Sequence, residues 1–465
     1  HASYPDGRLL SRSVSDGIGL TEVKLSDDDG TLTVTDASGG QTLYKYDVHG
    51  KLIATTGPNG ATRTYAYDAD GALIHAIDAV GGAWGIERDP AGNVASVSDP
   101  GGAKWAYSYG AAWPRPTRVT DPLGNVTKLE LDASGLLAAV SPPGEGTWTA
   151  SLAAPGQLLA LSDPLGNTMT IERAEDGLAK TWTSATGSVT AHGYADDGTL
   201  KMATDPVGAV WTADYDAAGR VTSMGDPLGN TWTLARNAAG SVVALTDPTQ
   251  SAVTFSFDAA QRLDAVGFAD GSHERWTLEA VGRPSAFQDR SGATTRFAYD
   301  AAGRLTGRTL PDGSVFAFGY DLAGRVITAA GADATITLQR GPTGLVTAER
   351  WSTGEEVRME RDALGRRQRL RFPDGSEVGY EYTSAGRPAA IREGAGAPLV
   401  AYSYLANGWL SRATFANGLT ADYEYDADGR VTRLAYTDSG GAVLLASAVT
   451  YDAAGRQSTV ISDVG

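Results

Sequence analysis

Glycine recurs in this chain at a nearly constant interval, and that interval constrains the fold more than any other feature. The segment Y-D-A-A-G-R occurs at Tyr215–Arg220, Tyr299–Arg304 and Tyr451–Arg456, and looser copies place a glycine about every 21 residues from Gly50 onward. A second glycine series, carried by D-P-L-G and P-D-G segments, runs halfway between the members of the first. Self-similarity at a fixed period is typical of a repeat protein, so we do not expect one compact enzyme fold.

Together the two series predict a turn every ten or eleven residues. Of the forty positions due for glycine between residues 39 and 455, four hold another residue: Trp113, Gln250, Gln261 and Ala334. The other positions, which include Gly396 and Gly440, account for most of the 58 glycines of the chain. Chance does not produce such a series.

The residues of each turn explain its conformation. In Asp226-Pro227-Leu228-Gly229, the aspartate can accept a hydrogen bond from its own backbone, proline presets φ, and glycine tolerates the left-handed region. The same segment occurs at 121–124 and 163–166. A type I turn followed by a left-handed glycine closes an antiparallel hairpin through a bulge, so the chain should reverse direction at every turn.

About six residues remain between turns, which is the usual length of a strand. Segments such as 230–234 and 315–318 alternate β-branched or aromatic residues with others, as strands do. Residues 355–370, rich in Arg and Glu, are the best helix candidate, yet Gly365 belongs to the turn series, and we interpret them as a charged strand pair. We therefore predict an all-β fold, a long antiparallel ribbon of hairpins that curls into a spiral, tube or hollow shell.

Composition narrows the class of protein further. The net charge of −17 argues against nucleic acid as a partner, because phosphate binding needs clustered Lys and Arg. Aspartates that open turns explain the acidity; a calcium-binding β-solenoid is the alternative, although its nonapeptide spacing is absent. The chain has no cysteine, no signal peptide is visible, and no apolar run is long enough to span a membrane.

No segment of the sequence carries a recognisable catalytic pattern. The histidines, His1, His49, His75, His192 and His273, form no H-E-x-x-H pair, and the chain has no G-x-S-x-G elbow and no phosphate-binding loop. A Ser-His-Asp site assembled from distant strands is a remote alternative. We assign no catalytic, cofactor-binding or metal-binding residue.

Two other local patterns have a simple structural interpretation. Asn125-Val126-Thr127 fits a glycosylation acceptor but follows directly from a D-P-L-G-N turn, to which we assign it. A tyrosine precedes many turns and could stack on sugars in a lectin-like surface, whereas its fixed place favours packing on the neighbouring strand; the clearest examples are Tyr46, Tyr67, Tyr215, Tyr299, Tyr320, Tyr425 and Tyr451.

The Y-D-x-x-G-R copies, alternating with D-P-L-G-N, resemble the YD repeats of the Rhs family of bacterial polymorphic toxins, of the related toxin-complex C components and of animal teneurins. The match covers roughly residues 30 to 465. The resemblance implies a cocoon of β-hairpins that holds a C-terminal toxin domain of the same polypeptide. In bacteria it also implies loading on a type VI secretion spike through an adaptor and delivery into competing cells.

The chain departs from the family pattern in one respect that bears on activity. Shells of this family typically end in D-P-x-G-W-type motifs whose aspartates cleave the toxin free. Asp121, Asp163, Asp205 and Asp226 open D-P-x-G turns here, but no tryptophan follows any of them. We therefore do not assign self-cleavage to this chain.

These observations lead to one leading hypothesis and one alternative. We expect a non-enzymatic encapsulating shell, secreted or delivered by a bacterial secretion system and cytoplasmic before export, with the toxin domain or other shell segments as its partners. A cell-surface adhesin or carbohydrate-binding repeat module is the alternative. Residues 1–30 are predicted to be an irregular cap or entry strand, and residues 31–465 a single repeat domain that belongs to a longer polypeptide.

Overall fold

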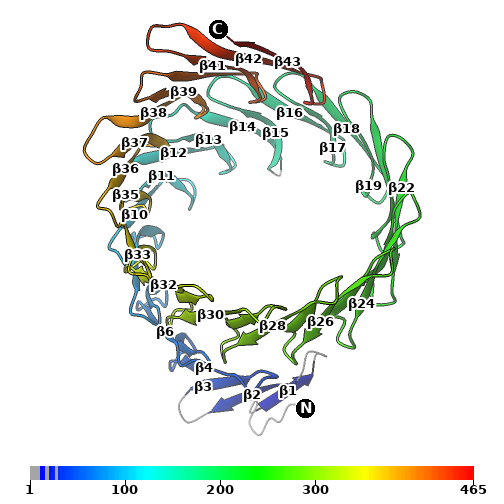
Figure 1. The fold of residues 1–465 in the computed structure, drawn as a ribbon, viewed down its shortest axis with the longest axis vertical. Helices are drawn as coiled ribbons and strands as arrows, with labels where there is room; N and C mark the ends of the chain where they lie inside the picture. The colour runs from blue at the N-terminus through cyan, green and yellow to red at the C-terminus, as the bar shows by residue number, and fades with distance from the viewer. Residues whose placement is uncertain (1–10, 16–19, 27–29, 155, 465) are drawn as a thin grey trace. The chain divides into compact units, whose positions relative to one another are not determined.

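The computed structural model describes residues 11–15, 20–26, 30–154 and 156–464. These residues contain forty-three β-strands in one antiparallel sheet, and no helix occurs among them. The prediction of an all-β ribbon of hairpins is confirmed (Figure 1). Much of the predicted N-terminal cap, at 1–10, 16–19 and 27–29, lies outside the described residues.

The chain forms two compact units, each built from two separate stretches of sequence. Unit 1 comprises residues 1–104 and 233–358, and unit 2 comprises residues 105–232 and 359–465. The boundaries between the units fall inside β10 (Lys104–Tyr109), β22 (Thr231–Arg236) and β34 (Glu356–Arg361).

The remaining strands of unit 1 are β1 (Ser11–Ser15), β2 (Leu20–Ser26), β3 (Thr31–Thr35), β4 (Gln41–Tyr46), β5 (Leu52–Thr56), β6 (Thr62–Tyr67), β7 (Leu73–Ile77), β8 (Ala83–Arg88), β9 (Val94–Ser98), β23 (Val242–Thr246), β24 (Ala252–Phe257), β25 (Leu263–Gly267), β26 (His273–Leu278), β27 (Pro284–Gln288), β28 (Thr294–Tyr299), β29 (Leu305–Thr309), β30 (Val315–Tyr320), β31 (Val326–Ala330), β32 (Thr335–Arg340) and β33 (Val346–Trp351).

The remaining strands of unit 2 are β11 (Pro116–Thr120), β12 (Val126–Leu131), β13 (Leu137–Ser141), β14 (Trp148–Ala153), β15 (Gln157–Ser162), β16 (Thr168–Arg173), β17 (Ala179–Thr183), β18 (Val189–Tyr194), β19 (Leu200–Thr204), β20 (Val210–Tyr215), β21 (Val221–Gly225), β35 (Arg367–Arg371), β36 (Glu377–Tyr382), β37 (Pro388–Glu393), β38 (Pro398–Tyr404), β39 (Leu410–Phe415), β40 (Thr420–Tyr425), β41 (Val431–Thr437), β42 (Val443–Tyr451) and β43 (Gln457–Val464).

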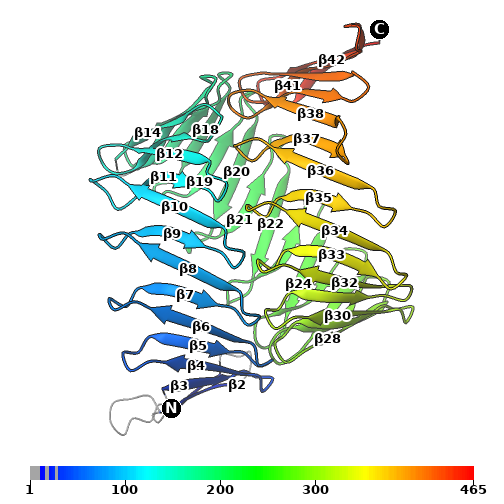
Figure 2. The same cartoon turned by 90° about the vertical axis from the view of Figure 1, so that its left-hand side faces the viewer.

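Successive strands pair with one another, so the order in space follows the order in sequence, as β3 to β9 show (Figure 2). In the hairpin of β28 and β29, Phe297 lies opposite Arg308, and the register shifts between Ala298 and Tyr299. That shift is the bulge expected before a type I turn with a left-handed glycine. Residues 355–370, the helix candidate, contribute the strands β34 and β35, as predicted.

Most of the predicted turn glycines adopt positive φ, and two do not. Near Gly396 the left-handed residue is Gly394, because β37 runs to Glu393 and Gly394 is the second residue of the turn that the Gly396 N–H closes on the Glu393 carbonyl. Near Gly440 it is Gly441, because β41 has seven residues and the turn opens one position later, at Asp438. The prediction chose the wrong glycine in both places.

Positions without glycine divide into two kinds. Gln250 and Gln261 keep the turn and take φ of 66° and 60°, and they are the non-glycine residues with positive φ in the described part of the chain. Trp113 and Ala334 have no such φ. At Ala334 the turn is shorter, with a hydrogen bond from the backbone N–H of Gly331 to the Ala334 carbonyl.

The sheet is a single layer, and its two faces differ. The accessible surface is 26076 Å², whereas a globular protein of 48.2 kDa exposes about 16,500 Å². On β24, Val253, Phe255 and Phe257 point to one side, and Thr254 and Ser256 point to the other. The side that carries the tyrosine of each Y-D turn is called the tyrosine face, and the other the opposite face.

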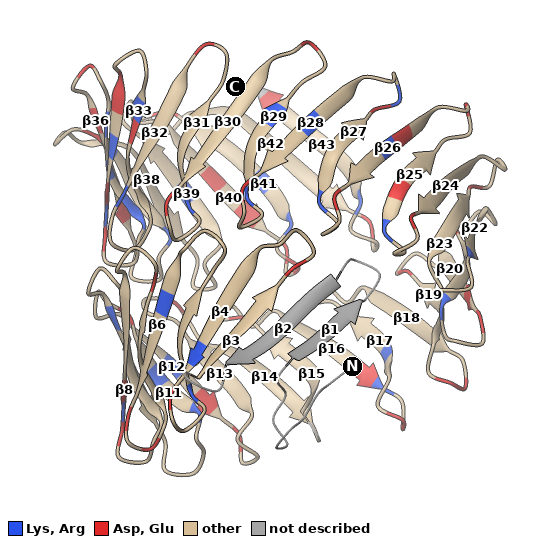
Figure 3. Cartoon of the chain, turned by 90° about the horizontal axis from the view of Figure 1, so that it is seen from below, with Lys and Arg blue, Asp and Glu red and all other residues tan. Residues whose placement is uncertain are grey.

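Side chains pack mainly along the tyrosine face rather than in a central core. A buried cluster of Val400, Ala413 and Ala421 in unit 2 is surrounded by partly buried neighbours that include Tyr402 and Tyr423. Acidic residues recur at the hairpin turns (Figure 3). The hairpin turns are therefore where the conspicuous sequence motifs and much of the charge come together.

Candidate functional site

The D-P-L-G-N turns are closed by their aspartate. Asp226 Oδ1 accepts hydrogen bonds from the backbone N–H of Leu228, at 2.9 Å, and of Asn230, at 2.8 Å. Its Oδ2 accepts one from the Asn230 side chain at 2.7 Å. The bond from the Asn230 side chain is the largest cause that lowers the pKa of Asp226, because it stabilises the charged carboxylate. The aspartates of these turns thus have a structural role in closing the hairpin.

The Y-D-x-x-G-R turns add a side-chain ion pair to the same closure. Asp300 Oδ1 accepts hydrogen bonds from the backbone N–H of Ala302 and Arg304, at 2.9 and 3.0 Å. Arg304 Nε donates to Asp300 Oδ2 at 2.7 Å. The arginine that follows the glycine is therefore held in place by the aspartate that opens the turn.

That arginine then contacts the next repeat. The Arg304 guanidinium lies 4.8 Å from the ring centre of Tyr320, and the Tyr320 hydroxyl donates to the carbonyl of Leu305 at 2.7 Å. A tyrosine thus binds to the backbone just after the glycine turn of the preceding repeat. We call this arrangement the tyrosine lock.

The tyrosine lock recurs along the chain. In each further copy, the tyrosine hydroxyl donates to a backbone carbonyl that lies 15 to 20 residues earlier in the chain. These tyrosines are Tyr67, Tyr194, Tyr215, Tyr299, Tyr382, Tyr404, Tyr425 and Tyr451. A cation lies over the ring in several copies, as Arg283 does over Tyr299 and Arg430 over Tyr451. The prediction that these tyrosines pack on the neighbouring strand is confirmed.

Arginine occupies the tyrosine position in some repeats, which the sequence comparison of turns overlooked. Arg173 donates to the carbonyl of Leu158 through Nε and one terminal nitrogen, at 3.2 and 3.0 Å. Arg340 does the same to Val326, at 3.1 and 2.7 Å. Both residues stand where a Y-D turn has its tyrosine, so aligning the repeats by their glycines would have revealed them.

The tyrosine face also bears large aromatic side chains that the structure leaves uncovered. Trp84 of β8, Trp182 of β17 and Trp211 of β20 are 43, 46 and 51 % exposed. On the opposite face, exposed ion pairs join neighbouring strands, such as Arg433 with Glu424 at 3.1 Å. One face can therefore offer apolar contact, and the other offers charge and small polar groups.

Within unit 2, turns from distant parts of the sequence touch at their tips. The Asn407 side chain, which is 2 % exposed, donates to Asp163 Oδ2 at 2.7 Å. The hydroxyls of Ser184 and Thr186 donate to Asp428 Oδ2 at 2.9 and 2.5 Å. We call this row of contacts the seam.

Two further contacts belong to the seam, and two of its aspartates have shifted pKa values. Arg387 forms an ion pair with Glu145, and the Ser384 hydroxyl donates to the Pro143 carbonyl at 3.1 Å. Burial alone would raise the pKa of Asp428, but hydrogen bonds from Thr186 and Ser184 outweigh it, so the pKa lies below its usual value. Burial also opposes ionisation of Asp163, whose pKa is nevertheless lowered by the side chains of Asn407 and Asn167.

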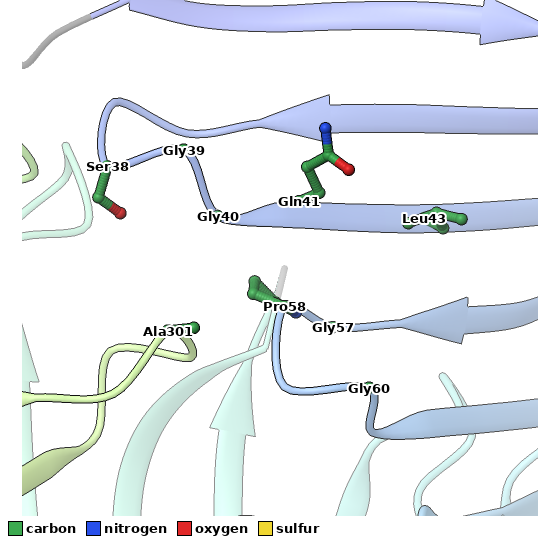
Figure 4. Close-up of a pocket in the computed structure, with 9 residues that line it drawn as sticks. All are labelled: Ser38, Gly39, Gly40, Gln41, Leu43, Gly57, Pro58, Gly60 and Ala301. Carbon is green, nitrogen blue, oxygen red and sulfur yellow. The ribbon is translucent and has the colours of Figure 1, made fainter.

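The hollows on the described surface differ in the groups that line them. One of about 470 Å³ in unit 1 is lined by Ser38, Pro58, Ala301 and several glycines, with no acid or base (Figure 4). Within the described ranges, no group of three or more His, Cys, Asp or Glu residues could hold a metal ion. The described part of the chain has no helix long and apolar enough to cross a membrane.

The histidines and the glycosylation-like triplet are placed as follows. His1 lies outside the described residues, while His49 is in a turn and His75, His192 and His273 are on β7, β18 and β26. His192 packs against Trp182 and Tyr194, with ring centres 6.3 and 6.5 Å apart. Asn125 donates to Asp121 Oδ2 at 2.9 Å, which confirms its assignment to the turn.

Comparison with known proteins agrees with this geometry. The RHS Repeat family matches residues 27–62, 46–83, 196–231, 279–315, 299–336 and 404–443. No curated protein sequence matches the chain.

Solved structures match over nearly the whole chain. A crystal structure of TcdB2–TccC3 is 13 % identical, with a TM-score of 0.65, over 100 % of this chain and 31 % of that one. The Tc holotoxin pore of Photorhabdus luminescens, with a TccC3 variant, is 14 % identical, with a TM-score of 0.61, over 98 % of this chain and 30 % of that one. The chain thus spans about a third of the length of these structures.

The sequence matches fall on the segments that contain the Y-D and D-P-x-G turns, and the structural matches show the same sheet of hairpins. The chain therefore carries RHS repeats, and its resemblance to the Rhs/YD-repeat family is confirmed.

Proposed function

We propose that this chain is a segment of the wall of a shell that encloses a toxin domain of the same polypeptide. Its role is containment, and it needs no catalytic residue of its own. The observation that carries the proposal is the single-layer sheet, which is held together repeat by repeat through tyrosine locks and leaves both faces accessible. A globular enzyme would bury one face under a second layer.

The likeness to toxin-complex structures supports the same role. All of this chain matches a part of TcdB2–TccC3, and TccC3 is part of a Tc holotoxin. The seam supports it as well, because turn tips that bond to one another close a gap between parts of the sheet that a guest could otherwise cross. We propose further that the protein is secreted or delivered by a bacterial secretion system, for which a type VI spike is the first candidate, and acts on competing bacteria.

Protease protection tests containment directly. The product of the complete gene is purified under native conditions and treated with a broad-specificity protease, and the fragments are mapped by mass spectrometry. The toxin domain should survive inside the intact protein and be degraded when it is expressed without the repeats. Equal rates of degradation in both samples would refute the containment role.

A carbohydrate-binding surface is the second candidate, favoured by the exposed tryptophans of the tyrosine face. Trp182 and Trp211 present rings that could stack on sugars, whereas the tyrosine hydroxyls are already engaged. Binding to a glycan array that disappears in Trp211→Ala would support this role. Absence of binding by the native chain would exclude it for the glycans on that array.

A further inference from the structure

The contacts of the seam in unit 2 are chemically matched at every tip. A carboxylate, Asp163, meets a side-chain amide donor, Asn407. Two hydroxyl donors meet a carboxylate acceptor, Asp428. These contacts use different pairs of chemical groups, so each turn tip binds a different kind of partner group.

A third contact uses opposite charges. Glu145, whose side chain is 9 % exposed, pairs with Arg387, which follows the glycine of its turn. The pairing with Glu145 raises the pKa of the Arg387 guanidinium above its usual value. The carboxylate is thus buried only where a cation faces it, as buried charges require.

Sliding one side of the seam by one repeat would break this match. If the later turns moved by one repeat, the turn that Asp163 opens would meet the turn that contains Asp428. Two carboxylates would then face each other where Asp163 is buried. Glu145 would face the turn followed by Trp409 and would lose its cation. Like charges and an unpaired buried carboxylate are both costly, so this register is disfavoured.

Sliding in the other direction has its own conflict. Asp205 opens a turn that lies close to the turn at 452–455, because Pro206 and Ala454 line one hollow and the charge of Asp205 acts on Arg456. The opposite shift would bring Asp205 against Asp428, again placing two carboxylates together. Each register error of one repeat therefore creates at least one repulsive contact.

We propose that the tips of the turns in unit 2 form a register code, in which the chemistry of each tip selects the one distant turn that can dock on it. The repeats are otherwise so similar that backbone pairing alone would accept several alignments. Asp163 with Asn407, the hydroxyls with Asp428, and Glu145 with Arg387 are the three positions that carry the code. This inference concerns the docking of the turns and does not depend on what the protein encloses.

The chain provides a matched control for the first of these positions. Asp226 opens an identical D-P-L-G-N turn with the same internal hydrogen bonds as Asp163. In the described structure no distant turn bonds to Asp226, and Leu228 at its tip is 87 % exposed, against 47 % for Leu165. A change at Asp226 therefore reports the cost of altering the turn alone.

A disulfide across the seam can report whether the turns are docked. A Cβ atom built at Gly144 would lie 3.8 Å from Cβ of Ser384, which is the usual separation in a disulfide. The chain has no cysteine, so Gly144→Cys with Ser384→Cys forms the only thiol pair. Strain from the positive φ of position 144 is common to all variants and cancels in the comparison.

The test introduces Asn407→Asp, Asp163→Asn, both together, or Asp226→Asn into this two-cysteine chain. Disulfide formation under mild oxidation is followed by non-reducing electrophoresis. Asn407→Asp should slow it at least about tenfold, because it removes a charge-assisted hydrogen bond and adds a like charge. The double exchange should restore the rate to within about twofold, since the donor and the acceptor of the seam bond have changed places. It also alters the bond that Asp163 Oδ2 accepts from the Asn167 side chain. Asp226→Asn alters the same bond in its own turn and should leave the rate unchanged.

Circular dichroism of each variant checks that the sheet has formed. The proposal is overturned if Asn407→Asp cross-links at the parental rate, or if the double exchange is as slow as the single change. It is also overturned if Asp226→Asn slows cross-linking as much as Asp163→Asn does. If a single variant does not fold, failure of the double exchange to restore strand content overturns it equally.

Discussion

Removing one hydroxyl group should loosen a single tyrosine lock by a predictable amount. Tyr320→Phe deletes the hydrogen bond to the Leu305 carbonyl and leaves the ring under Arg304. A neutral hydrogen bond of this kind contributes about 1 kcal/mol, which corresponds to about fivefold faster exchange of the amides that open with it. Hydrogen exchange by mass spectrometry, read over β29 and β30, measures this effect.

A second substitution at the same site makes the test sharper. Tyr320→Arg should recover at least half of the lost protection, because Arg340 makes the equivalent bond to the carbonyl of Val326. The repeat of Arg340 also has an arginine, Arg325, at the position that Arg304 holds beside Tyr320. Tyr65→Phe serves as the control, since its hydroxyl has no hydrogen-bond partner among the described residues and it should change little. Unaltered exchange in Tyr320→Phe, or an equal loss in Tyr65→Phe, would refute the lock as a source of stability.

Three further outcomes are expected. Gly219→Val, at a φ of 73°, should destabilise its hairpin by about 1 kcal/mol or more while the protein still folds, and a thermal melt showing complete unfolding would contradict this. Gln250→Gly should instead stabilise its hairpin by about 0.5 kcal/mol in the same assay, because φ at position 250 is already 66°, which glycine tolerates better than glutamine. The hydrogen bond from Ser272 is the largest cause that lowers the pKa of Asp270 to about 2. The stability that the ionised Asp270 carboxylate contributes is therefore present above about pH 4 and is lost as pH falls towards 2. Melts from pH 7 to 2 should show this loss, and Ser272→Ala should lessen it; a melting temperature that rises on acidification would contradict the reasoning.

The sequence was sufficient for the local structure because each turn is determined by residues that are adjacent in the chain. Asp226, Pro227 and Gly229 together define the hairpin, and the strands follow from the spacing between turns. The errors at Gly396 and Gly440 arose where two glycines lie close together and strand length alone decides which one turns. No local pattern states how far a strand extends, so the sequence alone does not determine which of two close glycines takes the left-handed conformation.

The tyrosine lock was only half visible in the sequence. The fixed place of Tyr299 and Tyr320 indicated packing, but the acceptor is a backbone carbonyl, which every residue possesses and which no pattern can mark. The arginines at the same position were not predicted, because arginine donates the same kind of hydrogen bond as tyrosine but has a different side chain. Both side chains reach the same carbonyl from the same strand end.

The seam lies beyond any local signal, because Asp163 and Asn407 are 244 residues apart. Its chemistry also explains why a repeat protein keeps some positions irregular. The turn tips at Asn407 and Asp428 depart from the alanine found at the same place in Y-D-A-A-G-R, and these departures make the seam contacts. The regular residues of each repeat build the sheet, and the irregular residues at its turn tips determine which turns meet.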